Sequence, residues 1–258
     1  MKIAVSGKGG VGKTLVAGAL AYSFAKKSFK TIAIDADPSP NLALTLGVPL
    51  EQVREIVPIS ENKPLIELKT GTKFSGVYQL SFTVDDVVHD FSVETPYGVK
   101  LIVMGTVKSI GSGCTCPENA VIRALLRYLI VKRDEAVIVD MEAGIEHLGR
   151  GTARHVDTML VVTDPTVKSL EIAKRIYELA EDAGIKQVFL VGNKVANEVE
   201  GDSIGKFAEN NSMLLLSLIP FDEKVLRAET RGETPLRNEQ SKAIRSIEKL
   251  GNRLMQSE

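Results

Sequence analysis

The sequence predicts an α/β fold: a doubly wound, mostly parallel β-sheet with helices on both faces. Short apolar segments alternate along the chain with helical patterns, as in proteins whose helices connect parallel strands. Some segments, such as Ala136–Asp140, are apolar at nearly every position, which is typical of strands covered on both faces. No Pro/Gly-rich linker divides the 258 residues. We therefore expect one domain over residues 1–258.

The elements follow from these patterns in chain order. The expected strands are Lys2–Ser6, Thr31–Ile34, Val99–Met104, Ala136–Asp140, Thr158–Thr163, Lys186–Val191 and Met213–Ile219. The expected helices are Gly12–Lys27, Asn119–Val131, a segment that follows Thr163 and ends near Ala183, Asp222–Arg231 and Glu239–Met255. Gln52–Thr95 mixes polar and β-branched residues, so we expect an irregular insertion there with a small hairpin. Ligands of such folds bind beyond the carboxyl ends of the strands.

Composition narrows the class of protein. The net charge of −1 and pI near 6.4 argue against a general nucleic-acid binder, which is usually strongly basic. Met1 leads directly into an apolar strand, without the pattern of a signal peptide. No apolar run approaches the length that spans a bilayer. We expect a cytoplasmic protein whose thiols stay reduced.

The segment Gly7–Thr14 matches the phosphate-binding pattern G-x-x-x-x-G-K-[ST] at every fixed position. Its inner residues, Gly9, Gly10, Val11 and Gly12, are expected to turn backbone N–H groups toward phosphate oxygens. Lys13 would reach the β- and γ-phosphates, and the Thr14 hydroxyl would bind Mg²⁺. A glycine-rich turn without a ligand is the alternative, but a strand precedes this segment and a helix follows it. We therefore predict a P-loop NTPase that binds and hydrolyses ATP to ADP.

An early second lysine, Lys8, gives the loop a resemblance to the deviant Walker A ATPases. These include the nitrogenase iron protein, septum-site (MinD-like) and plasmid-partition ATPases. The resemblance implies a homodimer that sandwiches nucleotide between its chains. Lys8 would then be catalytic, contacting phosphates held by the other chain, as an in-trans cation does in other phosphoryl-transfer enzymes. The alternative is a solvated loop lysine.

Carboxylate residues lie at the carboxyl ends of two of the expected strands. By resemblance, Asp37 orients or activates the attacking water, and Asp35 helps to hold the loop and the metal shell. Asp140 ends an apolar strand in the Walker B pattern and would hold Mg²⁺ through water. The N–H of Gly144 would sense the γ-phosphate. The alternatives are turn aspartates before Pro38 and a strand-end cap.

Two further segments resemble the adenine site of this superfamily. Asn193 and Lys194 follow a strand, and the Asn193 amide can both donate to and accept from the base. Pro220, within Ile219–Phe221, resembles the residue that lines the adenine pocket. An ordinary loop start after a strand is the alternative.

The only cysteines, Cys114 and Cys116, lie in a Gly/Ser/Pro loop before an expected helix. Proximity to a helix N-terminus favours the thiolate. Two thiolates are too few for a closed zinc site, but two copies of the pair on a two-fold axis supply four. Four sulfurs suit Zn²⁺ or Ni²⁺. An unliganded dithiol is the alternative.

Together and in order, these motifs resemble the maturation ATPases of nickel-dependent carbon monoxide dehydrogenase (the CooC type). The likeness includes Cys114–Asn119 and Asp140–Ala153, and it is weakest over Gln52–Thr95. It implies ATP-dependent delivery of nickel to the dehydrogenase as client enzyme, with Cys114 and Cys116 forming an inter-subunit site for Ni²⁺ (or Zn²⁺). It implies neither a nucleic-acid nor a membrane partner. His147 is either a coupling residue or a solvated one.

Three other functions compete with this one. A MinD/ParA-type positioning ATPase would use a membrane or DNA. The amphipathic C-terminal pattern, with Ile244, Ile247 and Leu250 opposite basic residues, would suit a membrane surface or packing on the core. An electron-transfer ATPase needs two well-separated cluster cysteines, unlike this pair. A carrier serving acetyl-CoA synthase is barely distinguishable from the first function.

Overall fold

The computed structural model describes residues 1–37, 41–64, 88, 91–105, 124–130, 135–144, 152–238 and 240–256. Their strands form an eight-stranded sheet in the order β3-β4-β2-β5-β1-β6-β7-β8. Every pairing is parallel except that of β3 with β4. The strands are β1 (Lys2–Gly7), β2 (Thr31–Ala36), β3 (Val93–Glu94), β4 (Val99–Val103), β5 (Ala136–Met141), β6 (Thr158–Thr163), β7 (Gln187–Val195) and β8 (Leu215–Pro220). This confirms the predicted fold class.

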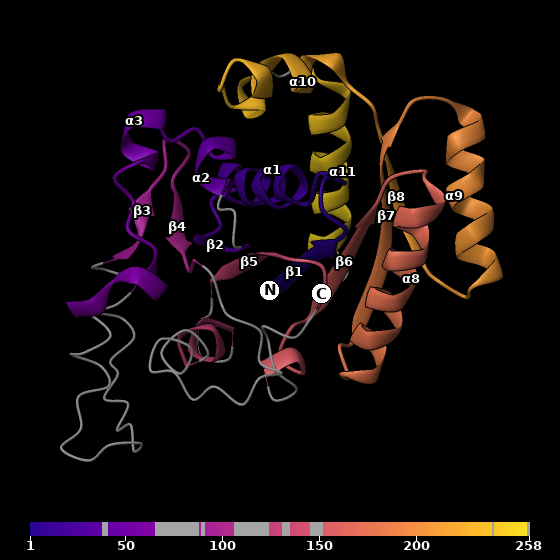
Figure 1. Ribbon diagram of the computed structural model, residues 1–258, viewed down its shortest axis with the longest axis horizontal. Helices are drawn as coiled ribbons and strands as arrows, with labels where there is room; N and C mark the ends of the chain where they lie inside the picture. Colours follow the sequence, from indigo (N-terminus) through magenta and orange to yellow (C-terminus); the bar gives the residue numbers. More distant parts are fainter. Residues whose placement is uncertain are drawn as a thin grey trace.

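Helices cover both faces of the sheet (Figure 1). On one face, α1 (Lys13–Lys26) and α11 (Lys242–Gln256) share an apolar cluster with the sheet. On the other, α8 (Val167–Asp182), α9 (Glu198–Asn210) and helical residues 124–130 share a second cluster. The remaining elements are α2 (Leu42–Thr45), α3 (Leu50–Val53), α10 (Glu223–Thr230) and the 3₁₀ turns η1 (Ile59–Glu61) and η3 (Pro235–Arg237).

The central strands are buried along their whole length, as their apolar sequences predicted. Every residue of β1, β2, β5 and β6 is buried. The predicted strands are all present with ends shifted by a few residues. The largest shift is in β7, which continues to Val195 instead of ending at Val191.

The sequence analysis missed α9. Its buried side is narrow, consisting of Gly201, Ile204 and Ala208, so the sequence lacks a broad apolar stripe. The helix begins at a cap in which the Asn197 side chain accepts a hydrogen bond from the Glu200 N–H at 3.0 Å. Of the predicted helix Asn119–Val131, the described residues 124–130 are helical.

The predicted insertion is described only in part. Within Gln52–Thr95, its described residues include the end of α3, η1 and β3. A hairpin is present, but it joins β3 to the sheet strand β4 through a turn at Gly98. Ile59 and Val88 are buried in the apolar clusters, so these parts of the segment are anchored to the domain.

The amphipathic stripe of α11 packs on the core of the domain. Ala243, Ile244, Ile247, Leu250 and Leu254 are buried there against α1 and β8. That stripe is therefore not a membrane-facing surface, which was one of the two interpretations. In the described ranges, no helix combines the length and apolar character needed to cross a bilayer.

The same helix covers the outer edge of β8. Arg253 donates from Nη1 to the Leu216 carbonyl at 2.9 Å, and the Ser246 hydroxyl donates to the Leu218 carbonyl at 3.2 Å. Among the described strands, β8 ends the sheet, so these side chains satisfy backbone acceptors that a neighbouring strand would otherwise use.

Candidate nucleotide-binding site

The loop between β1 and α1 requires glycine at its two ends. Gly7 has φ +152°, and a Cβ there would lie 2.2 Å from the Val162 carbonyl oxygen. Gly12 has φ +93° and immediately precedes α1. A Cβ at Gly12 would lie 2.3 Å from the Asn193 side-chain nitrogen. Both positions combine close approach with backbone angles that other residues rarely adopt.

Most of the residues predicted to bind nucleotide line one cavity of about 600 Å³, a volume typical of ligand sites. From the sequence prediction these are Gly9, Gly10, Gly12, Lys13, Thr14, Asp37, Asn193, Lys194 and Pro220. The cavity lies at the carboxyl ends of the parallel strands, as expected. The first turn of α1 has no acidic residue and no side-chain cap, so its N-terminal N–H groups and positive dipole are available to an anion.

The sequence analysis did not predict one wall of this cavity. Val225, Leu226 and Glu229 of α10 line it beside Pro220 and Phe221. Leu226 is 52% exposed and Phe221 is 44% exposed. No sequence motif marks an amphipathic helix such as α10 as part of a nucleotide site. Only the position of α10 in the fold shows that it forms this wall.

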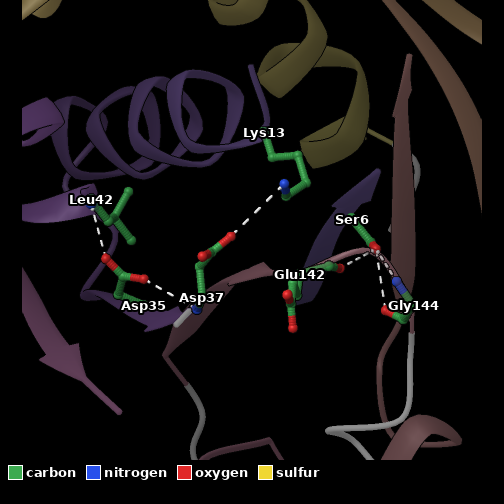
Figure 2. Close-up of polar contacts among 7 residues, drawn as sticks. All are labelled: Ser6, Lys13, Asp35, Asp37, Leu42, Glu142 and Gly144. Atoms are coloured by element: carbon green, nitrogen blue, oxygen red, sulfur yellow. Dashed lines mark hydrogen bonds and ion pairs between the residues drawn. The ribbon is translucent and has the colours of Figure 1, made fainter. Parts of the chain in front are cut away.

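Asp35 holds the segment that follows β2 (Figure 2). Its carboxylate accepts hydrogen bonds from the Leu42 N–H at 2.9 Å and the Asp37 N–H at 3.3 Å. Burial raises the pKa of Asp35 to about 6, although those hydrogen bonds lower it. The side chain is fully buried.

Asp37 lies beside the P-loop lysine. Its Oδ2 is 3.9 Å from the Nζ of Lys13, and their side chains are 21% and 7% exposed (Figure 2). Asp37, the first residue after β2, therefore approaches the P-loop. A carboxylate there is close to any phosphate that Lys13 binds.

Asp140 is a buried carboxylate close to the Thr14 hydroxyl. Neither of its oxygens has a partner among the described residues, although the Thr14 hydroxyl is close enough to lower its pKa. Burial dominates and raises the pKa of Asp140 to about 7, and the charges of Asp35 and Asp37 raise it further. Asp140 also pairs in register with Asp35 of the neighbouring strand.

These carboxylates fit a magnesium ion bound together with nucleotide. A buried carboxylate without a partner is costly, and a cation beside Thr14 would compensate it. Within the described ranges, no three His, Cys, Asp or Glu side chains form a metal cluster of their own. Mg²⁺ suits such a site, because it commonly takes one or two carboxylates and completes its shell with phosphate and water.

Asn193 and Lys194 hold the P-loop from the β7 side. Asn193 Nδ2 donates to the Val11 carbonyl at 2.8 Å, and Lys194 Nζ donates to the Gly10 carbonyl at 2.7 Å. Lys194 has φ +58°, and the β7–β8 register shifts between Gly192 and Val195. Such irregularities turn side chains away from the sheet pattern. The sequence analysis predicted contacts with adenine and did not foresee this clamp.

We expect Asn193→Ala to lower the affinity for Mg²⁺–ADP by about tenfold, because the buried Val11 carbonyl loses its partner and the loop loosens. Isothermal titration calorimetry measures the change. The matched control is Asn197→Ala, which removes the cap of α9 and should lower the melting temperature without changing affinity. Equal affinities for the wild type and Asn193→Ala would contradict the clamp.

Lys8 and Gly144 have other neighbours in the structure. Lys8 is half-buried and lies near Asp164. Burial would raise the pKa of Asp164, but hydrogen bonds from Thr166 and Ser169 and the charge of Lys8 hold it below its ordinary value. The Gly144 N–H, predicted to sense the γ-phosphate, donates to the hydroxyl of Ser6 at 3.1 Å. Cys114, Cys116 and His147 lie outside the described residues.

Comparison with known proteins identifies the class that this fold and loop define. The family model for the CobQ/CobB/MinD/ParA nucleotide binding domain matches residues 2–236. The chain belongs to this family, and it is an ATPase of the P-loop type.

Two relatives match nearly the whole chain. An uncharacterised ATP-binding protein of Methanocaldococcus jannaschii is 45% identical over 255 residues, covering 98% of this chain and 96% of that protein. The carbon monoxide dehydrogenase accessory protein CooC of Rhodospirillum rubrum is 44% identical over 234 residues, covering 90% and 88%. The likeness to CooC confirms the resemblance that the motifs indicated.

The solved structure of the MinD cell division protein of Aquifex aeolicus shares the fold. Its TM-score is 0.71 at 21% identity, over 99% of this chain and 97% of that one. At this identity the likeness extends to the fold alone.

Proposed function

We propose that this protein is a metallochaperone: a nucleotide-gated homodimer that binds nickel and delivers it to carbon monoxide dehydrogenase. The observation that carries the proposal is 44% identity over 90% of the chain to a protein named as a carbon monoxide dehydrogenase accessory protein. The cysteine pair Cys114 and Cys116 supports it, since a thiolate pair suits a soft metal cargo.

The P-loop binds the phosphates of ATP. Backbone N–H groups of Gly9, Gly10, Val11 and Gly12 surround the phosphate oxygens, and Lys13 contacts the β- and γ-phosphates. Support comes from the glycine geometry at Gly7 and Gly12 and from the available N-terminus of α1. The cavity beside this loop has room for the rest of the nucleotide.

Thr14 and Asp140 would hold Mg²⁺, which when bound would neutralise phosphate charge during hydrolysis. Asp37 positions the attacking water, and its place beside Lys13 supports this role. Asp35 keeps Asp37 in place through the hydrogen bond to its N–H. The Gly144 N–H binds the γ-phosphate when ATP is present.

The base occupies the end of the cavity formed by Asn193, Lys194 and Pro220. One N–H of the Asn193 amide already holds the P-loop, and its remaining groups face the adenine edge. The apolar side chains of α10 cover the base.

Lys8 acts on the neighbouring subunit of the homodimer. It completes a site whose phosphates are held by the other chain, so that hydrolysis requires assembly. Closure on ATP brings the Cys114 and Cys116 pairs of two chains together around Ni²⁺ (or Zn²⁺), and hydrolysis changes their spacing and metal affinity.

We expect a Cys114→Ser, Cys116→Ser variant to lose nickel binding and to keep ATP hydrolysis. Equilibrium dialysis with Ni²⁺ and with Zn²⁺, at each nucleotide state, should give one metal per wild-type dimer and none per variant dimer. Activation of the apo dehydrogenase by the wild type alone tests the client. Unchanged metal stoichiometry in the variant would rule out the cysteine site.

A further inference from the structure

Ser6 is the one hydroxyl in the otherwise apolar interior of β1, and it directly precedes the P-loop residue Gly7. It is fully buried. Its Oγ lies 2.7 Å from the Glu142 carbonyl oxygen and 3.1 Å from the Gly144 carbonyl oxygen, and it accepts the Gly144 N–H at 3.1 Å (Figure 2). The segment after β5 is therefore fastened to the strand that leads into the P-loop.

The chemistry of a hydroxyl makes this contact specific. Ser6 has one proton, so it donates to one of the two carbonyls at a time, while its lone pairs accept the N–H of Gly144. Gly144 has φ +129°, a conformation that glycine adopts readily and that places its N–H and carbonyl beside the same oxygen. The sequence position of Ser6, a small polar residue in an apolar strand, is its only signal.

The N–H that Ser6 accepts is the one assigned above to the γ-phosphate. One N–H cannot serve both acceptors fully. A hydrogen bond to phosphate is charge-assisted and stronger than one to a neutral hydroxyl. With ATP bound, the Gly144 N–H would therefore donate to the γ-phosphate. With ADP bound, which has no γ-phosphate, it would stay with the Ser6 hydroxyl.

We propose that Ser6 is a positioning residue that retains residues 142–144 against β1 until a γ-phosphate takes over the Gly144 N–H. This rests on the proposed function in the contact between Gly144 and the γ-phosphate. Because Ser6 lies in the central strand β1, which leads directly into the P-loop, the change of acceptor for this single N–H couples the state of the nucleotide to the segment after β5. Ser6 thereby sets how strongly the protein distinguishes ATP from ADP.

Removal of the hydroxyl should favour the ATP state. In Ser6→Ala, the Gly144 N–H has no acceptor on β1 in the nucleotide-free and ADP states, whereas the ATP state keeps its phosphate contact. We expect affinity for Mg²⁺ with a non-hydrolysable ATP analogue to rise about three- to tenfold, with ADP affinity unchanged. Ser6→Cys, a weaker hydrogen-bonding group, should lie between.

Titration calorimetry with the full-length protein tests this, with Ser23→Ala as the matched control because Ser23 is a buried serine of α1. Hydrogen exchange followed by mass spectrometry gives a second readout. The peptide that contains Gly144 should exchange faster in Ser6→Ala without nucleotide and equally in both proteins with the analogue.

The possible results distinguish a failure of the role proposed for Ser6 from a failure of the proposed function. If the wild type binds both nucleotides and Ser6→Ala weakens them equally, or lowers affinity for the analogue alone, the positioning role is overturned and the proposed function stands. If the wild type does not bind the analogue, both are overturned. A shift in the ratio of the two affinities, with altered exchange confined to the nucleotide-free and ADP forms, supports the role of Ser6.

Discussion

Lys8→Ala should lower ATP hydrolysis by about three orders of magnitude and leave ATP affinity nearly unchanged. Lys13, whose side chain is 7% exposed, is the cation proposed to bind the phosphates of its own chain. Lys8 is half-buried at the start of the loop, near Asp164, and its proposed role requires the second chain. Steady-state phosphate release and calorimetric ATP binding measure the two quantities separately.

Mixing two inactive variants shows in which chain Lys8 acts. Asp37→Asn should also be inactive, because it loses the carboxylate that we propose positions the attacking water. In a heterodimer of Lys8→Ala with Asp37→Asn, one site has an intact Asp37 and receives Lys8 from the partner. An equimolar mixture should recover about a quarter of wild-type activity, since half the dimers are mixed and each has one intact site. No recovery with demonstrated subunit exchange would show that Lys8 acts within its own chain.

Asp140→Asn should raise stability and remove activity. The wild-type carboxylate is buried without a hydrogen-bond partner among the described residues, and an uncharged amide of the same shape avoids the cost of burying a charge. Hydrolysis should fall about a hundredfold or more, because an amide does not replace the negative charge that would hold Mg²⁺. Thermal unfolding without nucleotide and phosphate release measure the two effects.

The gain in stability should depend on pH in a defined direction. The pKa of Asp140 is about 7 in the folded protein, against the ordinary value of 3.8 expected in the unfolded chain. The folded state therefore binds a proton on Asp140 more tightly than the unfolded state does. The wild type is therefore most stable, relative to Asp140→Asn, below about pH 4. It loses that stability as the pH rises to about 7, by on the order of 2–4 kcal/mol, and no further loss follows above pH 7.

Asp157→Asn serves as the control for this experiment. Asp157 accepts a hydrogen bond from the Lys2 N–H at 2.8 Å, just before β6 and away from the nucleotide cavity, so its replacement should lower stability and spare hydrolysis. A wild type that is more stable than Asp140→Asn at pH 8 without nucleotide would contradict the account of Asp140 as an uncompensated charge.

Much of the fold was predictable because its signals are local. The parallel strands at the centre of the sheet are apolar at almost every position, and glycine spacing identifies the P-loop. The strand order and the helix α9 were not predicted. Strand order depends on long-range packing, and α9 buries too few apolar residues to show a clear period.

Some residues of the site could be predicted from sequence motifs, and others could not. Lys13, Thr14, Asp37 and Asn193 belong to motifs, and the structure brings them to one cavity. Ser6 and the wall formed by α10 belong to none, since their positions arise only when β5 and α10 pack beside the loop. The clamp from Asn193 to Val11 joins residues 182 positions apart, a contact that no local pattern indicates.

The covering of β8 by Ser246 and Arg253 also bears on how this protein behaves when it is abundant in a cell. An open strand edge recruits other chains through backbone pairing and leads to fibrous aggregates. Here two acceptors on that edge are already engaged by α11. Pairing of two copies of the chain along the β8 edge is thereby disfavoured.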